Sequence, residues 1–349
     1  MPQLNPYHYD TAHFLSRDSL STMIINRRRF VASMGVAITA ALARNQPLAA
    51  APVSGVARRK VLFDTDIGND IDDAIALSYL LAHPHCDLLG ITTVTGEPEK
   101  RAELASALCH LAGRPDIPIF PGAARPLVVA QLQPEAEQHA ALGSLPRQTD
   151  FGQGEAIEFL RKTIRAHPGE VTLLAVGPMT NLGLLFRADP EIPGLLRELV
   201  VMCGKFDPKP FSWGHAEWNA RLDPEATAIV YDSAPPIFRS YGLDVTFKVS
   251  LPGPEFFRRF AEHPRLKPVV DFARVTHADK KEIVFHDPLA AVSLFVPEIC
   301  GMERGRVTIE LKDGPDKGRT VWTPDATGPC EVAFTVDAEK FFKSYFEVF

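Results

Sequence analysis

Five aspartates lie within ten positions of the chain, at Asp64, Asp66, Asp70, Asp72 and Asp73. Carboxylates crowded this closely raise one another's pKa and oppose folding, so the group needs a positive partner. A hard divalent cation that takes oxygen ligands, Ca²⁺ or Mg²⁺, would supply that charge. Helix capping is the alternative for two or three of them, because carboxylates are favoured near a helix N-terminus. The pattern predicts a metal-binding or catalytic site.

The aspartates fall between a short strand and a helix. Val61, Leu62 and Phe63 predict the end of a buried strand, and an apolar pattern at helical spacing runs from Ile71 to Leu81. In an open α/β sheet, a strand-to-helix turn of this kind lies at the carboxyl edge of the sheet, where ligands bind.

The rest of the chain alternates between predicted strands and helices. Strand-like runs occur at 87–95, 117–120, 171–176, 198–203 and 236–241. Helical patterns occur at 99–112, 154–166, 179–188 and 223–232. This alternation predicts an α/β fold with a mostly parallel open sheet that is flanked by helices.

Two segments depart from the alternation. Residues 123–150 have no period and predict a long loop, which could act as a lid. Residues 304–336 carry shorter alternating runs around Asp313-Gly314-Pro315, which predicts a small C-terminal hairpin added to the sheet. Because no linker rich in Gly, Ser or Pro divides the chain, residues 58–349 are expected to form one domain.

The first 51 residues have the pattern of an export signal. Residues 1–22 are polar and aperiodic, and we expect them to be disordered. RRRFV at 27–31 resembles a twin-arginine signal, and the apolar stretch that follows reaches about residue 43. That stretch is shorter than the about 20 residues that span a bilayer, which argues against a membrane anchor. We expect cleavage near Ala51 and a periplasmic protein without membrane contact.

Composition excludes several classes of partner. The chain is 46% hydrophobic and 23% charged, which is ordinary for a globular protein. A net charge of −6 argues against nucleic acid or an anionic membrane surface as a partner. The five cysteines form no CxxC pair, so neither a zinc site nor a disulfide framework is indicated.

Three further stretches place polar groups at the start of a predicted helix or just before one: GPMTN (177–181), EWN (217–219) and HDP (286–288). A ring between a carboxylate and an amide, as in EWN, suits sugar binding, because hydroxyls need acceptors and the ring packs on apolar carbon. Each stretch also has a structural interpretation as a turn, a polar loop or a helix cap. Their joint occurrence at the ends of successive strands favours one shared site.

Together with the aspartate-rich turn, these stretches resemble nucleoside hydrolases of the inosine–uridine-preferring type, from Lys60 to the C-terminus. The family opens with DxDxGxDDA, which stands here as DTDIGNDIDDA, two residues longer. GPxTN, E-aromatic-N and HDP follow in order, and SYGLDVT (240–246) precedes the last of them. The resemblance implies the family's fold, and hydrolysis of ribonucleosides or a related ribosyl compound to free base and ribose.

The resemblance also implies a Ca²⁺ site. Asp66 and Asp73 would bind the ion through their carboxylates, Thr180 through its backbone carbonyl, and Asp287 through a further carboxylate. Substrate hydroxyls and water would complete the six to eight oxygen ligands that calcium takes. Asp66 would in addition be the general base for the attacking water, in an inverting reaction without a covalent intermediate.

The substrate contacts follow from the same resemblance. Asp72 would hold the ribose 2′- and 3′-hydroxyls, while Glu217 and Asn219 bind the sugar beside Trp218. His286 would face the nucleobase and could protonate it as it leaves. Cleavage of an N-ribosidic bond develops positive charge on the sugar, which nearby carboxylate and amide oxygens stabilise.

The chain departs from the family pattern at three places. Glu97 stands where the family often has Asn, which predicts a further carboxylate near the ribose and the ion. Phe211 or a neighbour replaces a common Asn, and Asp70 is extra. An unusual nucleoside or another ribosyl compound is therefore open as the substrate. Family members are commonly dimers or tetramers, so a homo-oligomer is open as well.

Other classes of protein remain as alternatives. A periplasmic nucleoside- or sugar-binding protein with a retained calcium site would bind nucleoside without releasing base. FDTD after a strand also resembles a haloacid-dehalogenase-like phosphatase, but Ile67-Gly68-Asn69 does not fit that family, whose members would release phosphate. An EF-hand loop is disfavoured because Gly68 falls at its fifth position and no Glu closes twelve residues.

Overall fold

Strand β1 (Arg59–Thr65) lies inside a nine-stranded sheet of order β10-β9-β11-β6-β5-β4-β1-β2-β3. The computed structural model describes residues 57–207, 209 and 214–349. β1 to β6 run parallel, and β11 extends this parallel set beside β6. The other parallel strands are β2 (Cys86–Thr93), β3 (Ile119–Pro121), β4 (Val171–Ala175), β5 (Glu198–Met202), β6 (Phe238–Tyr241) and β11 (Cys330–Val336).

The sheet continues into an antiparallel end. β9 (Cys300–Ile309) pairs antiparallel with both β11 and β10 (Thr320–Pro324). The predicted hairpin is therefore present, and β11 joins it to the parallel strands. A separate antiparallel pair consists of β7 (Ser250–Pro252) and β8 (Glu282–Val284).

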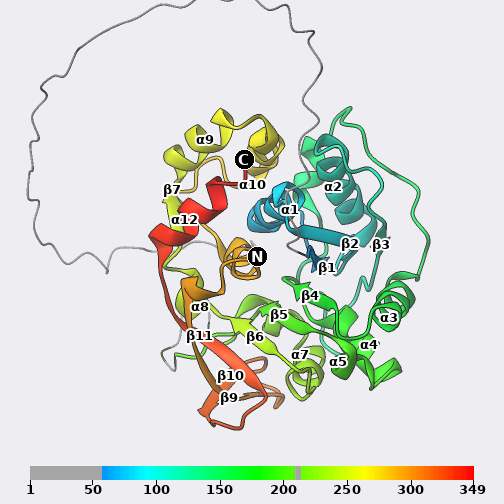
Figure 1. The fold of residues 1–349 in the computed structure, drawn as a ribbon, viewed down its shortest axis with the longest axis vertical. Coiled ribbons are helices and arrows are strands. Elements are labelled where there is room, and N and C mark those ends of the chain that lie inside the picture. The colour runs from blue at the N-terminus through cyan, green and yellow to red at the C-terminus, as the bar shows by residue number, and fades with distance from the viewer. Residues whose placement is uncertain (1–56, 208, 210–213) are drawn as a thin grey trace, which may run out of the picture. The chain divides into compact units, whose positions relative to one another are not determined.

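Helices cover both faces of the sheet (Figure 1). The side chains of β1 show why: Val61 and Phe63 belong to one buried cluster, and Leu62 between them belongs to the other. Successive strand residues point to opposite faces, so a continuous apolar run means burial on both sides. One cluster includes residues of α1 (Asp72–Ala82), α2 (Pro98–Leu111), α9 (Gly253–Glu262), α10 (Lys267–Thr276), α11 (His286–Ser293) and α12 (Ala338–Phe346). The other includes residues of α3 (Ala156–Ala166), α4 (Thr180–Ala188), α5 (Ile192–Leu195) and α7 (Pro224–Tyr231).

Helix α1, which begins with two of the aspartates, is fixed by its neighbours. It packs against α11, and the Tyr345 hydroxyl of α12 donates to the Ile75 carbonyl of α1 at 3.1 Å. The ring of Tyr345 also stacks on the ring of Tyr79. These contacts hold the start of α1 at a set position beside the start of α11.

The predicted α/β fold is confirmed, with nearly every predicted strand and helix within a few residues of its observed bounds. Two short helices near the predicted polar stretches, α6 (Trp218–Leu222) and α8 (Leu243–Thr246), were not predicted, and neither were α9, α10 or α12. Three 3-10 turns also occur, at Glu137–Ala141, Pro264–Leu266 and Pro297–Ile299.

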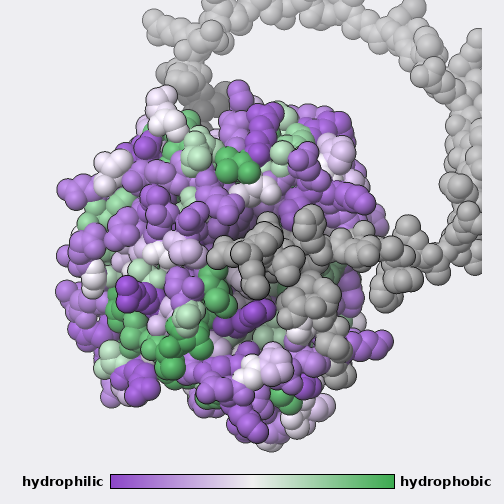
Figure 2. Space-filling view, turned by 180° about the vertical axis from the view of Figure 1, so that it is seen from behind, coloured by the Kyte–Doolittle hydropathy of each residue, from purple (hydrophilic) through white to green (hydrophobic). Residues whose placement is uncertain are grey.

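Residues Val56–Phe349 form one compact unit. In the view of Figure 2 its surface is mostly hydrophilic, and the largest group of hydrophobic residues on that face lies at the lower left. None of the helices in the described part of the chain is both long and apolar enough to span a membrane. The predicted export signal and the predicted departure near Phe211 lie outside the described residues.

Candidate active site

The candidate site lies where the strand order reverses between β1 and β4. In open α/β sheets, the chain leaves neighbouring strands toward opposite faces at such a point, which opens a crevice for ligands. The acidic turn follows β1, and GPMTN (177–181) follows β4. EWN (217–219) follows β5, and HDP (286–288) opens α11.

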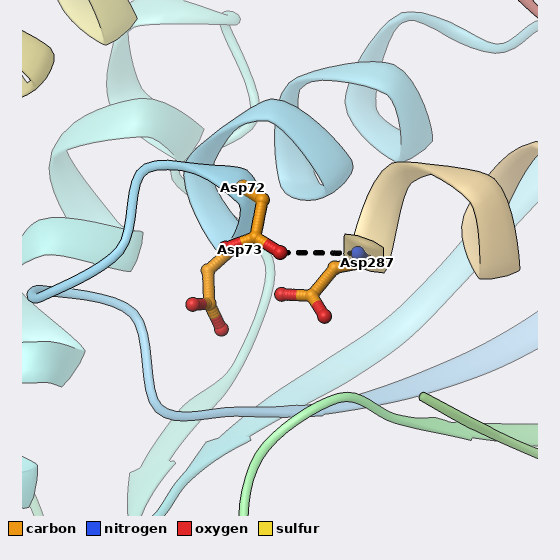
Figure 3. A group of neighbouring side chains, drawn as sticks. All are labelled: Asp72, Asp73 and Asp287. Carbon is orange, nitrogen blue, oxygen red and sulfur yellow. Dashed lines mark hydrogen bonds between the residues drawn. The ribbon is translucent and has the colours of Figure 1, made fainter. Parts of the chain in front are cut away.

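Three buried carboxylates converge at the heart of this edge (Figure 3). One oxygen from each of Asp72, Asp73 and Asp287 lies within 4.8 Å of the other two. Asp72 and Asp73 begin α1, and Asp287 lies in the first turn of α11. The Asp287 backbone N–H donates to Asp72 Oδ2 at 3.2 Å, and the Thr65 hydroxyl donates to Asp73 Oδ1. We call these three residues the aspartate triad.

The electrostatics of the aspartate triad favour a bound cation. Burial, and then repulsion between neighbouring carboxylates, raises the pKa of Asp72, Asp73 and Asp287 well above the ordinary value. A cation would reverse this effect, because opposite charge favours the ionised form. The donors are all carboxylate oxygens, which hard divalent ions such as Ca²⁺ and Mg²⁺ prefer. The residues present therefore fit such an ion.

Asp66 lies beside the aspartate triad but has contacts of its own. Its carboxylate Oδ2 accepts a hydrogen bond from Gln133 Nε2 at 2.7 Å, and its backbone carbonyl accepts one from Arg101. Burial raises the pKa of Asp66, although Arg101 and Gln133 both oppose that rise. Charge on Asp66 in turn raises the pKa of Asp73 and of Asp287, so the carboxylates act on one another.

The two remaining aspartates of the acidic turn are bonded elsewhere. Asp64 accepts hydrogen bonds from the Thr92 hydroxyl and the Asn181 amide, while burial raises its pKa to about 7. Asp70 forms an ion pair with His277, with 2.9 Å between Oδ1 and Nε2. Burial opposes ionisation of Asp70, but His277 prevails and lowers its pKa to about 2. The five aspartates therefore do not form one cluster.

The predicted sugar-binding residues lie at the same edge and are tightly bonded. Glu217 caps α6, and its carboxylate accepts backbone N–H groups of Asn219, Ala220 and Gly204. Asn219 Nδ2 donates to the carbonyls that follow β4 and end β5, those of Val176 and Met202. Trp218 Nε1 donates to Gln133 Oε1. The helix-cap interpretation thus describes Glu217 well. Asn219 in addition links the ends of β4 and β5 by hydrogen bonds.

His286 and Thr180 are both buried at the site. His286 Nδ1 lies 2.7 Å from the Thr246 hydroxyl, and the ring meets the Phe247 ring edge-on. Burial lowers the pKa of His286 to about 4, although Asp70 opposes this. The Thr180 hydroxyl donates to Asp223 Oδ2 at 2.7 Å.

The carboxylate of Glu97 is engaged away from the aspartate triad. Its Oε1 lies 2.6 Å from Lys100 Nζ, and its Oε2 accepts the Ala136 backbone N–H at 3.1 Å. The pKa of Glu97 is lowered, and the hydrogen bond from Lys100 is the largest cause. Through its hydrogen bond with the Ala136 N–H, Glu97 anchors the loop that follows β3.

Two residues of this edge were not predicted from the sequence. Arg101 is fully buried and donates to the carbonyls of Thr95, Ile67 and Glu135 as well as Asp66. A charged residue among the apolar positions of a predicted helix was the available signal for it. Gln133 bridges Asp66 and Trp218 from residues 123–150, where the sequence has no period and offers no signal.

Chemically, this edge can bind a divalent ion and a small hydroxylated molecule. The aspartate triad supplies oxygen ligands, and Asp66 supplies a carboxylate that can accept a proton. Trp218 supplies a ring beside these groups. Hydrolysis of a sugar derivative by water is a reaction that this set of groups can catalyse.

Known proteins share this architecture. Residues 61–343 match the family described as inosine-uridine preferring nucleoside hydrolase. A pyrimidine-specific ribonucleoside hydrolase of Salmonella enteritidis is 33% identical over 277 residues, which cover 75% of this chain and 87% of that protein. Uridine nucleosidase 1 of Arabidopsis thaliana is 29% identical, with 80% and 90% covered. A solved plant nucleoside hydrolase is 27% identical, with a TM-score of 0.71 and 83% and 98% covered.

Proposed function

Because the chain belongs to the inosine-uridine preferring nucleoside hydrolase family, and is therefore a glycosyl hydrolase that acts on nucleosides, we propose that it cleaves ribonucleosides with calcium as its ion. The products would be free base and ribose. The observation that carries the calcium part of the proposal is the aspartate triad, whose buried oxygens lie within 4.8 Å of one another. Membership of the family favours hydrolysis over the binding-protein alternative.

We assign the ion to carboxylates at the starts of two helices. Asp73 and Asp287 belong both to the ligand set that the resemblance implies and to the aspartate triad. Asp66 and the Thr180 carbonyl complete the proposed ligands. A calcium ion held by these residues would supply a positive charge that helps to orient the ribose hydroxyls and to lower the pKa of the attacking water. Asp72, whose Oδ2 is held by the Asp287 backbone N–H, is proposed to receive the ribose 2′- and 3′-hydroxyls.

Asp66 is proposed as the general base. It lies within the range at which its charge acts on Asp73 and Asp287, and it is only 7% exposed. A Cβ at Gly177 would lie 2.8 Å from Asp66 Oδ1, so the absence of a side chain there leaves room for the carboxylate. A positioned base of this kind contributes about 10²- to 10⁴-fold to a proton transfer.

The leaving base would meet His286. Because burial lowers the pKa of His286 to about 4, the ring is neutral near pH 7 and would act there through a hydrogen bond. The bond between its Nδ1 and the Thr246 hydroxyl orients the ring. Glu217 and Asn219 would bind the sugar beside Trp218. A contact between Glu97 and the sugar would require its carboxylate to leave Lys100 and the Ala136 N–H. Export to the periplasm is part of the proposal and is supported by the pattern at residues 27–31.

The test is ribose release from a panel of purine and pyrimidine ribonucleosides by purified protein, with calcium and after chelation. We expect release that needs calcium and that falls by at least about 10²-fold in Asp66→Ala. Release that persists unchanged after chelation would refute the calcium part. Absence of release from every nucleoside, in protein that has bound calcium, would refute ribonucleosides as the substrate.

A further inference from the structure

The loop after β3 is bonded to the acidic turn along its central part. Gln138 donates its backbone N–H to the Gly68 carbonyl at 2.8 Å, and its side chain donates to the carbonyls of Asn69 and Asp70. The backbone carbonyl of Glu135 accepts a hydrogen bond from Arg101 at 3.0 Å. Residues 131–138, which we call the strap, therefore have a defined position over the turn that carries Asp66.

Gln133 is the residue of the strap that enters the site. Gln133 is buried, with only 7% of the residue exposed. Its backbone N–H donates to Gln131 Oε1 at 2.7 Å, and Gln131 Nε2 donates to the Thr95 hydroxyl at 2.8 Å. These two bonds fix the backbone from which the Gln133 side chain extends.

The Gln133 carboxamide joins two functional groups that have opposite requirements. Asp66 Oδ2 can only accept a hydrogen bond when ionised, and Trp218 Nε1 can only donate one. An amide has a donor and an acceptor, and its two partners dictate which end faces which. A side chain without both groups, such as Met, cannot form this chain of hydrogen bonds.

We propose that Gln133 is a positioning residue, which holds the carboxylate of Asp66 and the ring of Trp218 in the arrangement that catalysis needs. This inference rests on the proposed function of the same site. Rotation of the Asp66 carboxylate would break its 2.7 Å bond to the amide, so the bond restrains the plane of the base. Rotation of the Trp218 ring would break the other bond in the same way.

The strap therefore forms part of the active site and keeps one conformation there. A base displaced by about 1 Å can lose about 10²-fold in rate, so loss of the restraint should appear mainly in kcat. Because Gln133 reaches the reaction through Asp66, the strap links the loop's conformation to the proton-transfer step. Gln133 lies outside all of the motif stretches identified in the sequence.

The test compares Gln133→Met with Gln148→Met in the full-length protein. Met has nearly the shape of Gln but forms neither bond. Gln148 lies in the same loop, and within the described part of the chain its amide donates only to the exposed Asp150 carbonyl, so it provides the matched control. Three quantities are measured: kcat and KM for ribose release, calcium affinity by calorimetry, and solvent exchange of the Trp218 indole N–H by NMR. Trp218→Phe identifies that resonance.

We expect Gln133→Met to lower kcat by about 10- to 100-fold with a smaller change in KM. The Trp218 indole N–H should shift and exchange faster with solvent, while Gln148→Met matches wild type in every measurement. The double variant Gln133→Met/Trp218→Phe should lose less than the product of the two single losses, because one hydrogen-bonded chain is broken in each.

Wild-type kcat in Gln133→Met would overturn the proposal, as would an unchanged indole resonance. A lower melting temperature alone, at unchanged kcat, would show that Gln133 only stabilises the loop. If the wild-type protein released no ribose, that result would count against the proposed function. The indole resonance and the calcium affinity would then decide whether Gln133 holds Trp218 and Asp66, because neither needs turnover.

Discussion

Two parts of one acidic turn differ in how the fold treats their charge. Asp70 has His277 at 2.9 Å, and this partner lowers its pKa to about 2 even though burial acts in the opposite direction. Asp73, three residues later, is buried near other carboxylates, so burial and then their repulsion raise its pKa well above the ordinary value. Both side chains are largely buried.

The difference identifies which aspartates serve ligand binding. Asp70 has His277 as a hydrogen-bonding and electrostatic partner within the protein, so it needs no ion. The aspartate triad brings three carboxylates together, and their ionised forms are disfavoured until a positive charge arrives. Buried charges that raise one another's pKa are a mark of functional sites, because a stable fold would otherwise avoid them.

The largest expected effect comes from the aspartate triad. Asp287→Asn keeps the shape of the side chain but removes one charge from the proposed calcium site, so ribose release should fall by about 10³-fold or more. Steady-state kinetics measure the loss, and circular dichroism checks the fold. If Asp287→Asn kept activity within tenfold of wild type, the distinction between Asp287 and Asp70 would be wrong, because neither carboxylate would then be needed for catalysis.

Calcium should stabilise the protein more strongly as pH rises. Aspartates of the unfolded chain lose their protons near pH 4, whereas burial and repulsion raise the pKa of Asp73 and Asp287 in the metal-free fold. Their contribution to metal-free stability is therefore complete below about pH 4 and is lost as pH rises through the raised values. Calcium replaces the missing protons, so its effect grows over that interval.

Thermal unfolding at pH 5 and pH 8 measures this difference. At a calcium concentration one hundred times the Kd for calcium at pH 8, calcium should raise the unfolding free energy at pH 8 by about 2.7 kcal/mol relative to the metal-free protein. At pH 5 the same concentration should give a smaller gain, because protons compete for the carboxylates. An equal or larger gain at pH 5 would contradict the raised pKa values.

Asp70→Asn should affect stability more than chemistry. Removal of the carboxylate leaves His277 with a weaker partner, which should cost about 1–3 kcal/mol of unfolding free energy at pH 7. Since the pKa of Asp70 is lowered, its contribution is present above about pH 4 and disappears as pH falls through about 2. Urea unfolding measures the cost, and kcat should remain within tenfold of wild type. A loss of activity comparable to that of Asp287→Asn would remove the distinction between the two parts of the turn.

The sequence was informative where regular structure and short motifs carry the information. Continuous apolar runs such as the one in β1 predicted buried strands, and the positions of Asp72, Asp73 and Asp287 at helix starts followed from apolar spacing. Those positions lie at the carboxyl edge because the topology of a parallel sheet brings its strand ends together.

The missed features depend on contacts between distant parts of the chain. The partner of Asp70 is at the end of α10, and the partner of Asp66 is on a loop 67 positions away. No local pattern relates His277 to Asp70 or Gln133 to Asp66. The sequence therefore predicted a group of five aspartates, while their division into paired and unpaired charges became visible only with the tertiary structure.

The central claim is that Asp73 and Asp287 of the aspartate triad hold the divalent ion together with Asp66, and that Asp70 does not. Calorimetric titration of calcium into chelator-treated wild type, Asp287→Asn and Asp70→Asn tests it most directly. We predict one calcium site per chain in wild type and in Asp70→Asn, and loss of that site in Asp287→Asn. Retention of the site in Asp287→Asn, or its loss in Asp70→Asn, would contradict the account.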